Sequence, residues 1–160
     1  MHKSLSPLKE SGLLLQQPAI LLAQEPHLRI LDKTAKKENQ VKVPSNIGNN
    51  IIYYKGEDAR ACIYASGGLC VLPCPDWSSR DIAAAIWIED KKHILLVSMY
   101  LDGLENVTTN LQKLEPIIKY ANDRDLFLVI QIDSNAHHGM WGSDNDDERG
   151  QDLLEYILAK

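Results

Sequence analysis

Short apolar runs separated by polar segments follow one another along most of the chain, a pattern typical of β-strands. The runs are rich in Ile, Leu, Val and Ala, and most are too short for a stable helix. Polar residues, Gly and Pro stand between them, as expected for turns and loops. We predict strands at residues 19–23, 51–54, 61–65, 69–72, 82–88, 93–100 and 126–132.

Helical spacing of apolar residues appears at residues 107–122 and again near the C-terminus. Within the first stretch, Pro116 should kink or restart the helix, because proline cannot donate a backbone hydrogen bond. The last helix begins at about Glu148, and a short helix after Ser6-Pro7 extends to about Gln17. One side of the last helix carries its apolar residues, which are Leu153, Leu154, Ile157 and Leu158.

The order of these elements favours a single layered α/β domain over residues 1–160. Several strands follow one another without a helix between them, which argues against a strict alternation of strand and helix. We therefore predict an α/β sandwich in which two mixed β-sheets pack face to face, with the helices outside. A chain of 160 residues with 44% hydrophobic residues can bury one substantial core.

Charge and cysteine content narrow the possible functions. A net charge of -5 argues against a protein that binds nucleic acid through a basic face alone, but it is compatible with a metal-dependent nuclease, whose site needs carboxylates. The odd number of cysteines and the lack of an apolar leader indicate an intracellular protein with no membrane partner. Cys62, Cys70 and Cys74 lack further ligands at zinc spacing, so we interpret them as small buried hydrophobic residues.

The most informative polar segment, Asp133-Ser134-Asn135, follows the apolar run at 126–132. Because strand side chains alternate, the carboxylate and the amide should point the same way. One interpretation is a hydrolytic site that positions a water and holds a phosphate oxygen. The alternative is an Asx-rich turn that only caps the strand.

Two other strands also end in polar residues, at Glu25 and Tyr100. Sites in layered α/β folds gather at the carboxyl ends of strands, although each residue could also be an ordinary surface residue. We interpret His137 and His138 as ordinary loop residues rather than metal ligands, and Trp141 as a packing residue rather than a platform for base stacking. The coincidence of polar residues at three strand ends favours a site.

The ordered set of motifs resembles the endonuclease/exonuclease/phosphatase superfamily, in particular the apurinic-endonuclease-like DNA endonuclease domain of non-LTR retrotransposons. The motifs occur in family order with family-like spacing and span nearly the whole chain. They are Gln24-Glu25-Pro26, residues 60–66, Ser79-Arg80-Asp81, residues 97–100, residues 133–138, Trp141-Gly142-Ser143 and Arg149-Gly150.

The resemblance implies a Mg²⁺-dependent phosphodiesterase that nicks DNA, with Mn²⁺ as a possible substitute for Mg²⁺. It implies that Glu25 coordinates the metal and that Asp133 orients or deprotonates the attacking water. Asn135 would bind a phosphate oxygen, and Tyr100 would contact the phosphate in the transition state. Oxygen ligands of this kind suit Mg²⁺. The resemblance also implies a nuclear location for the full-length element protein, and it leaves the oligomeric state open.

The chain departs from the family at both ends. The family begins with a strand that ends in a metal-binding asparagine, and it continues after the last helix with strands that carry a Ser-Asp-His segment. The resemblance therefore implies a partial domain, with a sandwich that is incomplete at the C-terminus and impaired activity. Two alternatives stay open: a non-catalytic remnant or incomplete gene model of such an element, and a superfamily relative that acts on a small phosphorylated substrate.

Overall fold

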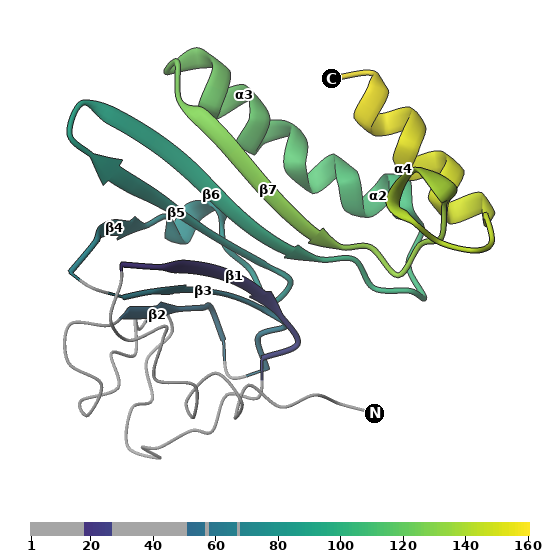
Figure 1. The fold of residues 1–160 in the computed structure, drawn as a ribbon, viewed down its shortest axis with the longest axis horizontal. Helices are drawn as coiled ribbons and strands as arrows, with labels where there is room; N and C mark the ends of the chain where they lie inside the picture. Colours follow the sequence, from purple (N-terminus) through teal and green to yellow (C-terminus); the bar gives the residue numbers. More distant parts are fainter. Residues whose placement is uncertain (1–17, 27–50, 57, 67) are drawn as a thin grey trace.

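The computed structural model describes residues 18–26, 51–56, 58–66 and 68–160, and within these ranges it forms two packed sheets with helices on one side (Figure 1). The predicted helix that ends near Gln17 lies outside the described residues. The strands are β1 (Ile20–Gln24), β2 (Ile51–Tyr53), β3 (Ala61–Ala65), β4 (Cys70–Pro73), β5 (Ile82–Glu89), β6 (Lys92–Tyr100) and β7 (Phe127–Asp133). The helices are η1 (Pro75–Trp77), α2 (Val107–Leu111), η2 (Gln112–Leu114), α3 (Glu115–Asp123), η3 (Gly139–Trp141) and α4 (Glu148–Leu158).

The two sheets differ in strand direction. The three-stranded sheet has the order β1-β3-β2 and is wholly antiparallel, whereas the four-stranded sheet has the order β4-β5-β6-β7 and contains a parallel pair, β6 and β7. The prediction of two mixed sheets is therefore right for the second sheet and wrong for the first. A parallel pair needs a long crossover connection, and α2, η2 and α3 provide that connection between β6 and β7.

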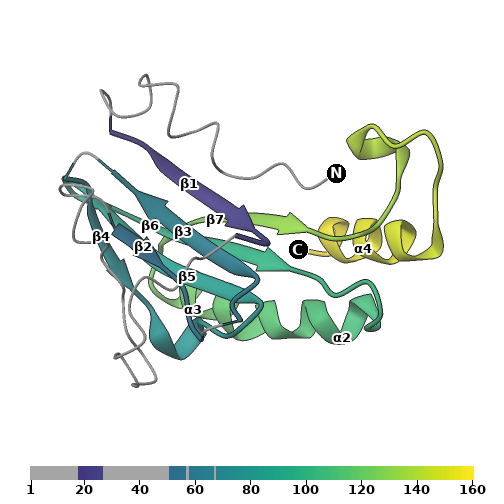
Figure 2. The same ribbon diagram turned by 90° about the horizontal axis from the view of Figure 1, so that it is seen from below.

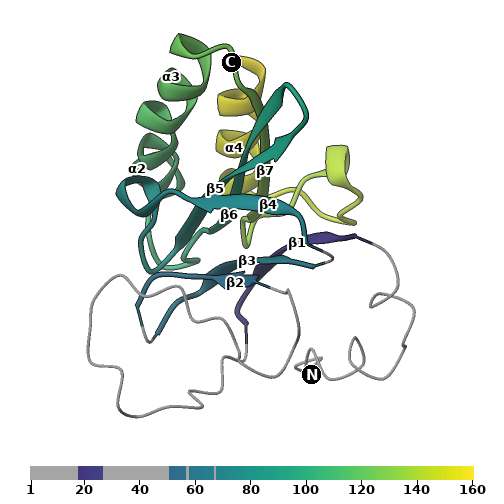
Figure 3. The same ribbon diagram turned by 90° about the vertical axis from the view of Figure 1, so that its left-hand side faces the viewer.

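A core of apolar side chains joins the facing surfaces of the two sheets. Leu22 and Ile63 from the first sheet pack against Ala83, Ala85 and Leu96 from the second. The alanines of β5 are fully buried, and their small side chains allow the sheets to approach closely. The predicted sandwich is thus confirmed, and Figure 3 shows its layers, with α2, α3 and α4 on the outer side of the second sheet.

The helices bury the other face of the four-stranded sheet. Leu95 and Val97 of β6 contact a cluster that includes Leu111, Leu114 and Ile117. The predicted restart of the helix is confirmed, because α3 begins next to Pro116 and places this proline in its first turn, where no intrahelical donor is needed. None of the helices in the described ranges is long and apolar enough to cross a membrane.

Helix α4 packs through a narrower face than the sequence indicates. Leu153 is 4% exposed, but Ile157 and Leu158 are 51% and 75% exposed. The apolar side of α4 is therefore buried at Leu153 and exposed to solvent in the last turn. Helix α4 contacts α2, and the Tyr156 hydroxyl donates a hydrogen bond to the carbonyl oxygen of Leu111.

The three cysteines occupy different environments, and all are free thiols. Cys62 of β3 is buried, and burial raises the pKa of its thiol to about 12. Cys74 is partly buried, whereas Cys70 is exposed. The interpretation of all three as buried residues is wrong for Cys70, because it lies on β4 at the edge of its sheet.

Strand β7 is an edge strand with two unlike faces. Leu128, Ile130 and Ile132 pack on the core beneath the helices, whereas Phe127 and Val129 are 62% and 47% exposed. Within the described residues, β7 pairs only with β6. The face of β7 that carries Phe127 is therefore an open flank of the sandwich.

Candidate active site at the carboxyl ends of the strands

Strands β1, β6 and β7 end at the same side of the sandwich (Figure 1). Tyr100, the last residue of β6, is the Cα partner of Asp133, the last residue of β7. From β1, the side chain of Gln24 donates a hydrogen bond of 2.9 Å to the Ser98 hydroxyl. That hydroxyl donates in turn to the carbonyl oxygen of Ala23 at 3.0 Å. These contacts hold the ends of the two sheets together where the sequence places its polar residues.

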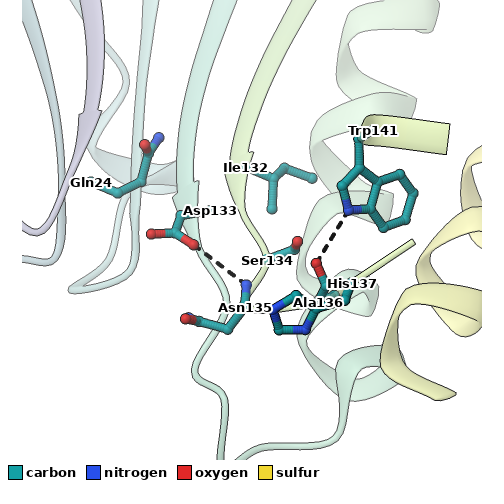
Figure 4. Close-up of a pocket in the computed structure, with 8 residues that line it drawn as sticks. All are labelled: Gln24, Ile132, Asp133, Ser134, Asn135, Ala136, His137 and Trp141. Carbon is teal, nitrogen blue, oxygen red and sulfur yellow. Dashed lines mark hydrogen bonds between the residues drawn. The ribbon is translucent and has the colours of Figure 1, made fainter. Parts of the chain in front are cut away.

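A cleft of about 520 Å³ opens at this end (Figure 4). Asp133 and Asn135, two of the four predicted site residues, line it. The described part of β1 contributes Gln24 to the lining rather than Glu25. The complete lining is Gln24, Ile132, Asp133, Ser134, Asn135, Ala136, His137 and Trp141.

Asp133 and Asn135 are arranged by a turn as well as by the strand. Strand β7 ends at Asp133, and Asn135 has a φ of 47°, a left-handed conformation that asparagine tolerates. The backbone N–H of Asn135 donates to Asp133 Oδ1 at 3.4 Å, and its side-chain amide donates to the carbonyl oxygen of Leu101 at 2.9 Å. The segment is thus an Asx turn whose side chains also line a cleft, and its use as a hydrolytic site stays a prediction.

Glu25 lies one residue beyond β1, and its backbone is left-handed, with a φ of 46°. The residue is exposed, and its backbone N–H donates to the carbonyl oxygen of Arg60 at 2.8 Å. Glu25 therefore sits at the same end of the sandwich as the cleft, next to Arg60.

Arg60 contacts several side chains in this region, and no role was predicted for it from the sequence. Its Nε atom is 2.6 Å from an oxygen of Asp81, and its Nη1 atom is 2.6 Å from an oxygen of Asp102. The guanidinium also lies over the Tyr100 ring, 4.5 Å from the ring centre. The backbone N–H of Leu104 and then Arg60 lower the pKa of Asp102, and the bond to Asp81 raises the pKa of Arg60. Arg60 thus fixes the surroundings of Tyr100.

Arg149, the first residue of the Arg-Gly motif, connects two loops at this end of the sandwich. Its guanidinium donates to three backbone carbonyl oxygens that belong to Ser134, Glu105 and Asp102, at 2.8, 2.6 and 2.8 Å. It therefore joins the loop after β6 to the loop after β7. Gly150, the second residue of the motif, has no room for a side chain, because a Cβ atom there would clash with the carbonyl group of His137.

His137 and Asp147 form a pair at the rim of the cleft. His137 Nδ1 lies 2.8 Å from Asp147 Oδ2, while Asp147 Oδ1 accepts the backbone N–H of Gly150 at 2.6 Å and so caps α4. Hydrogen bonds from the His137 side chain and from backbone N–H groups lower the pKa of Asp147. Figure 2 shows the loop between β7 and α4 that carries this pair extending beyond the sheets.

His138 and Trp141 have mainly structural contacts. His138 Nδ1 accepts the backbone N–H of Met140, and its ring packs against Trp141 with a centroid separation of 5.2 Å. The Trp141 indole donates to the carbonyl oxygen of Ala136 at 3.2 Å and keeps 39% of its surface exposed. These contacts agree with the interpretation of Trp141 as a packing residue.

The donors at this end fit a hard divalent cation. Within the ranges that the structure describes, no group of three His, Cys, Asp or Glu side chains is arranged to hold a metal ion. Mg²⁺ does not require such a group, because it commonly binds one or two carboxylates and completes its shell with waters and substrate phosphate. The carboxylates of Glu25 and Asp133 and the amide oxygen of Asn135 are oxygen donors of this kind.

Comparison with known proteins confirms the resemblance that the motifs indicate. Residues 94–160 match a family model described as endonuclease-reverse transcriptase. The fold is similar to the solved structure of the endonuclease domain of TRAS1, a telomere-specific non-LTR retrotransposon, with a TM-score of 0.65 and 22% sequence identity. This match covers 88% of the present chain and 57% of the solved one. No curated protein matches the chain.

Proposed function

We propose that this chain is part of a DNA-nicking endonuclease domain of a non-LTR retrotransposon and that its site hydrolyses phosphodiester bonds with Mg²⁺. The observation that carries this proposal is the cleft at the carboxyl ends of the strands, where Asp133 and Asn135 lie together and Tyr100 pairs with Asp133. The family match over residues 94–160, which include these three residues, supports it.

Each residue has a distinct role in this proposal. The Asp133 carboxylate accepts a hydrogen bond from the attacking water and orients it toward phosphorus. The Asn135 amide has a second N–H group besides the one bonded to Leu101, and this group binds a phosphate oxygen. The Tyr100 hydroxyl contacts the same phosphate, with its ring held by Arg60.

Glu25 would hold Mg²⁺, or Mn²⁺ in its place. When bound, the ion supplies stabilisation of the negative charge that develops on the phosphate. We also propose a nuclear location for the full-length element protein, because its proposed substrate is DNA.

We also propose that the 160 residues alone have impaired activity. The chain spans 57% of the solved endonuclease domain, so the remaining part would supply further groups to the site. Catalysis is sensitive to the loss or displacement of one positioned group.

The test is a nicking assay on supercoiled plasmid with Mg²⁺. We expect the 160-residue protein to nick no faster than buffer, and a longer polypeptide with the rest of the domain to nick at a measurable rate. Asp133→Ala should abolish this rate, whereas Asp123→Ala, at the end of α3, should leave it unchanged. Nicking by the longer protein that survives Asp133→Ala would refute the proposed site. Nicking by the short chain that Asp133→Ala removes would refute only the impairment.

A further inference from the structure

Arg60, the residue before β3, joins the two sheets at the site end through both its backbone and its side chain. Its carbonyl oxygen accepts the backbone N–H of Glu25 at 2.8 Å, and its own N–H donates to the carbonyl oxygen of Arg80 at 2.7 Å. The side chain is 17% exposed and lies between two carboxylates, those of Asp81 and Asp102. Arg60 therefore connects the end of β1 to the start of β5 and to the loop after β6.

The loop after β6 carries this contact to both residues that are predicted to contact phosphate. The Arg60 guanidinium lies over the Tyr100 ring, 4.5 Å from the ring centre. Leu101, which precedes Asp102, accepts the side-chain amide of Asn135 on its carbonyl oxygen at 2.9 Å. One arginine thus contacts Tyr100 directly and reaches Asn135 through two residues of the same loop.

We propose that Arg60 is a positioning residue that holds Tyr100 and Asn135 at the separation needed to contact one phosphate. Arg60 acts through these two residues and does not itself contact the substrate. This inference rests on the proposed function, because Tyr100 and Asn135 contact a phosphate only when the cleft binds DNA.

Electrostatics explains why loss of Arg60 would move this loop. The side chains of Asp81 and Asp102 are 16% and 25% exposed, and they share one guanidinium. Without the cation the two carboxylates repel each other, so Asp102 turns toward water and the loop follows. Arg149 also holds this loop, but it binds the backbone carbonyl oxygens of Asp102 and Glu105. The loop would therefore shift on its Arg60 side and stay attached to the loop after β7.

The first test is the rate of plasmid nicking by the longer polypeptide that contains the rest of the domain. Arg60→Met should lower kcat about 100-fold, the cost of misplacing a group by about 1 Å, and should leave KM nearly unchanged. Arg60→Lys should give a smaller loss of kcat, because an ammonium keeps the charge but cannot form the planar fork. The matched control is Arg80→Met, whose ion pair with Asp58 is exposed and which should keep the wild-type rate.

A double-mutant cycle separates positioning from a general structural role. Tyr100→Phe removes the hydroxyl through which Arg60 would act. The loss of kcat caused by Arg60→Met should therefore be smaller in the Tyr100→Phe protein, about tenfold instead of 100-fold. A purely structural role predicts the same loss in both proteins.

A further measurement needs no catalysis and uses the 160-residue protein. In NMR spectra, the Tyr100 ring and the Asn135 side-chain amide should shift in Arg60→Lys and stay in place in Arg80→Met. Arg60→Lys keeps a cation between the two carboxylates, so this comparison holds even where Arg60→Met does not fold.

The outcomes separate this inference from the proposed function. A longer protein that nicks with unchanged kcat in the Arg60 variants, together with unshifted Tyr100 and Asn135 signals, would overturn the role of Arg60 alone. Equal losses in the two arms of the cycle would also overturn it. A longer protein that does not nick would overturn the proposed function, and this role with it.

Discussion

The carboxyl end of the sandwich and the open flank of β7 differ in the contacts that their side chains make. At the carboxyl end, two arginines each bond to several partners, and turns are held by side chains such as Asp133 and Asp147. On the flank, the apolar side chains of Phe127 and Val129 face solvent. The site end is therefore ordered by contacts among described residues, whereas the flank has the composition of a surface that another segment or chain would cover.

The proposed site and the sheet edge therefore depend on different contacts. The polar network fixes the loops that carry the candidate site, and the flank adds to this end a hydrogen bond of 3.3 Å from the Gln131 side chain to that of Gln24. The flank, in contrast, bears a strand edge that pairs with no other strand in the described ranges, and such an edge favours pairing with another strand.

The largest effect is expected at the site end, for Arg149→Ala. Loss of three hydrogen bonds to backbone carbonyl oxygens should lower the free energy of unfolding by about 3 kcal/mol, because those acceptors lose their charged partner. Chemical denaturation measures this. The control is Arg124→Ala, whose contact with the Tyr120 ring is exposed and should cost about 0.5 kcal/mol. Equal effects of the two substitutions would contradict the special role of Arg149.

The two faces of β7 allow a direct comparison within one strand. Ile130→Ala should lower the free energy of unfolding by about 2 kcal/mol, because its side chain packs on the core beneath the helices. Val129→Ala should cost less than about 1 kcal/mol, because Val129 is 47% exposed. Chemical denaturation of the two variants in parallel compares their losses in the free energy of unfolding. A larger cost at Val129 would show that something covers the flank.

The pH dependence of stability should reveal the cap at Asp147. Its pKa is lowered in the folded protein, so its carboxylate stabilises the fold above its unfolded pKa, and this stabilisation is lost as the pH falls through the folded pKa. Asp147→Asn should therefore reduce the melting temperature at about pH 7, and the difference from wild type should shrink by about pH 3. Asp144→Asn, an exposed carboxylate in the same loop, serves as the control. A difference that grows on acidification would contradict this sign.

The smallest effect on stability is expected for Phe127→Ser. Its 62% exposure means that the free energy of unfolding should change by less than about 0.5 kcal/mol. Self-association at high protein concentration should nevertheless fall, and sedimentation velocity measures it. Leu104→Ser, which removes a 98% exposed side chain elsewhere, should leave association unchanged. If both substitutions reduce association equally, the flank is not a specific surface.

Much of the fold was predictable because its signals are local. The short apolar runs predict each described strand to within a residue or two, and Pro116 predicts the restart of α3. The wholly antiparallel first sheet, the exposed thiol of Cys70 and the exposed end of α4 depend on which elements meet in three dimensions, so the pattern along the chain did not indicate them.

The candidate site was predictable to a similar extent. Asp133, Asn135 and Tyr100 follow from the rule that polar residues gather at the ends of strands. Arg60 did not follow, because its partners Asp81 and Asp102 are distant in sequence and nothing in the local pattern marks them. The roles of Glu25, Tyr100, Asp133 and Asn135 in catalysis stay predictions.

The connections between strands also bear on the order in which the molecule folds. Strands β5 and β6 form a hairpin whose short turn contains Asp90 in a left-handed conformation, so this pair closes a very small loop. The parallel pair of β6 and β7 must instead wait for the crossover through α2 and α3, and β1 must pair with β3 across a long intervening segment. Because long loops close more slowly than short ones, we expect the hairpin to form early. The cleft is then completed late in folding, when Gln24 and Asp133 reach the end of β6.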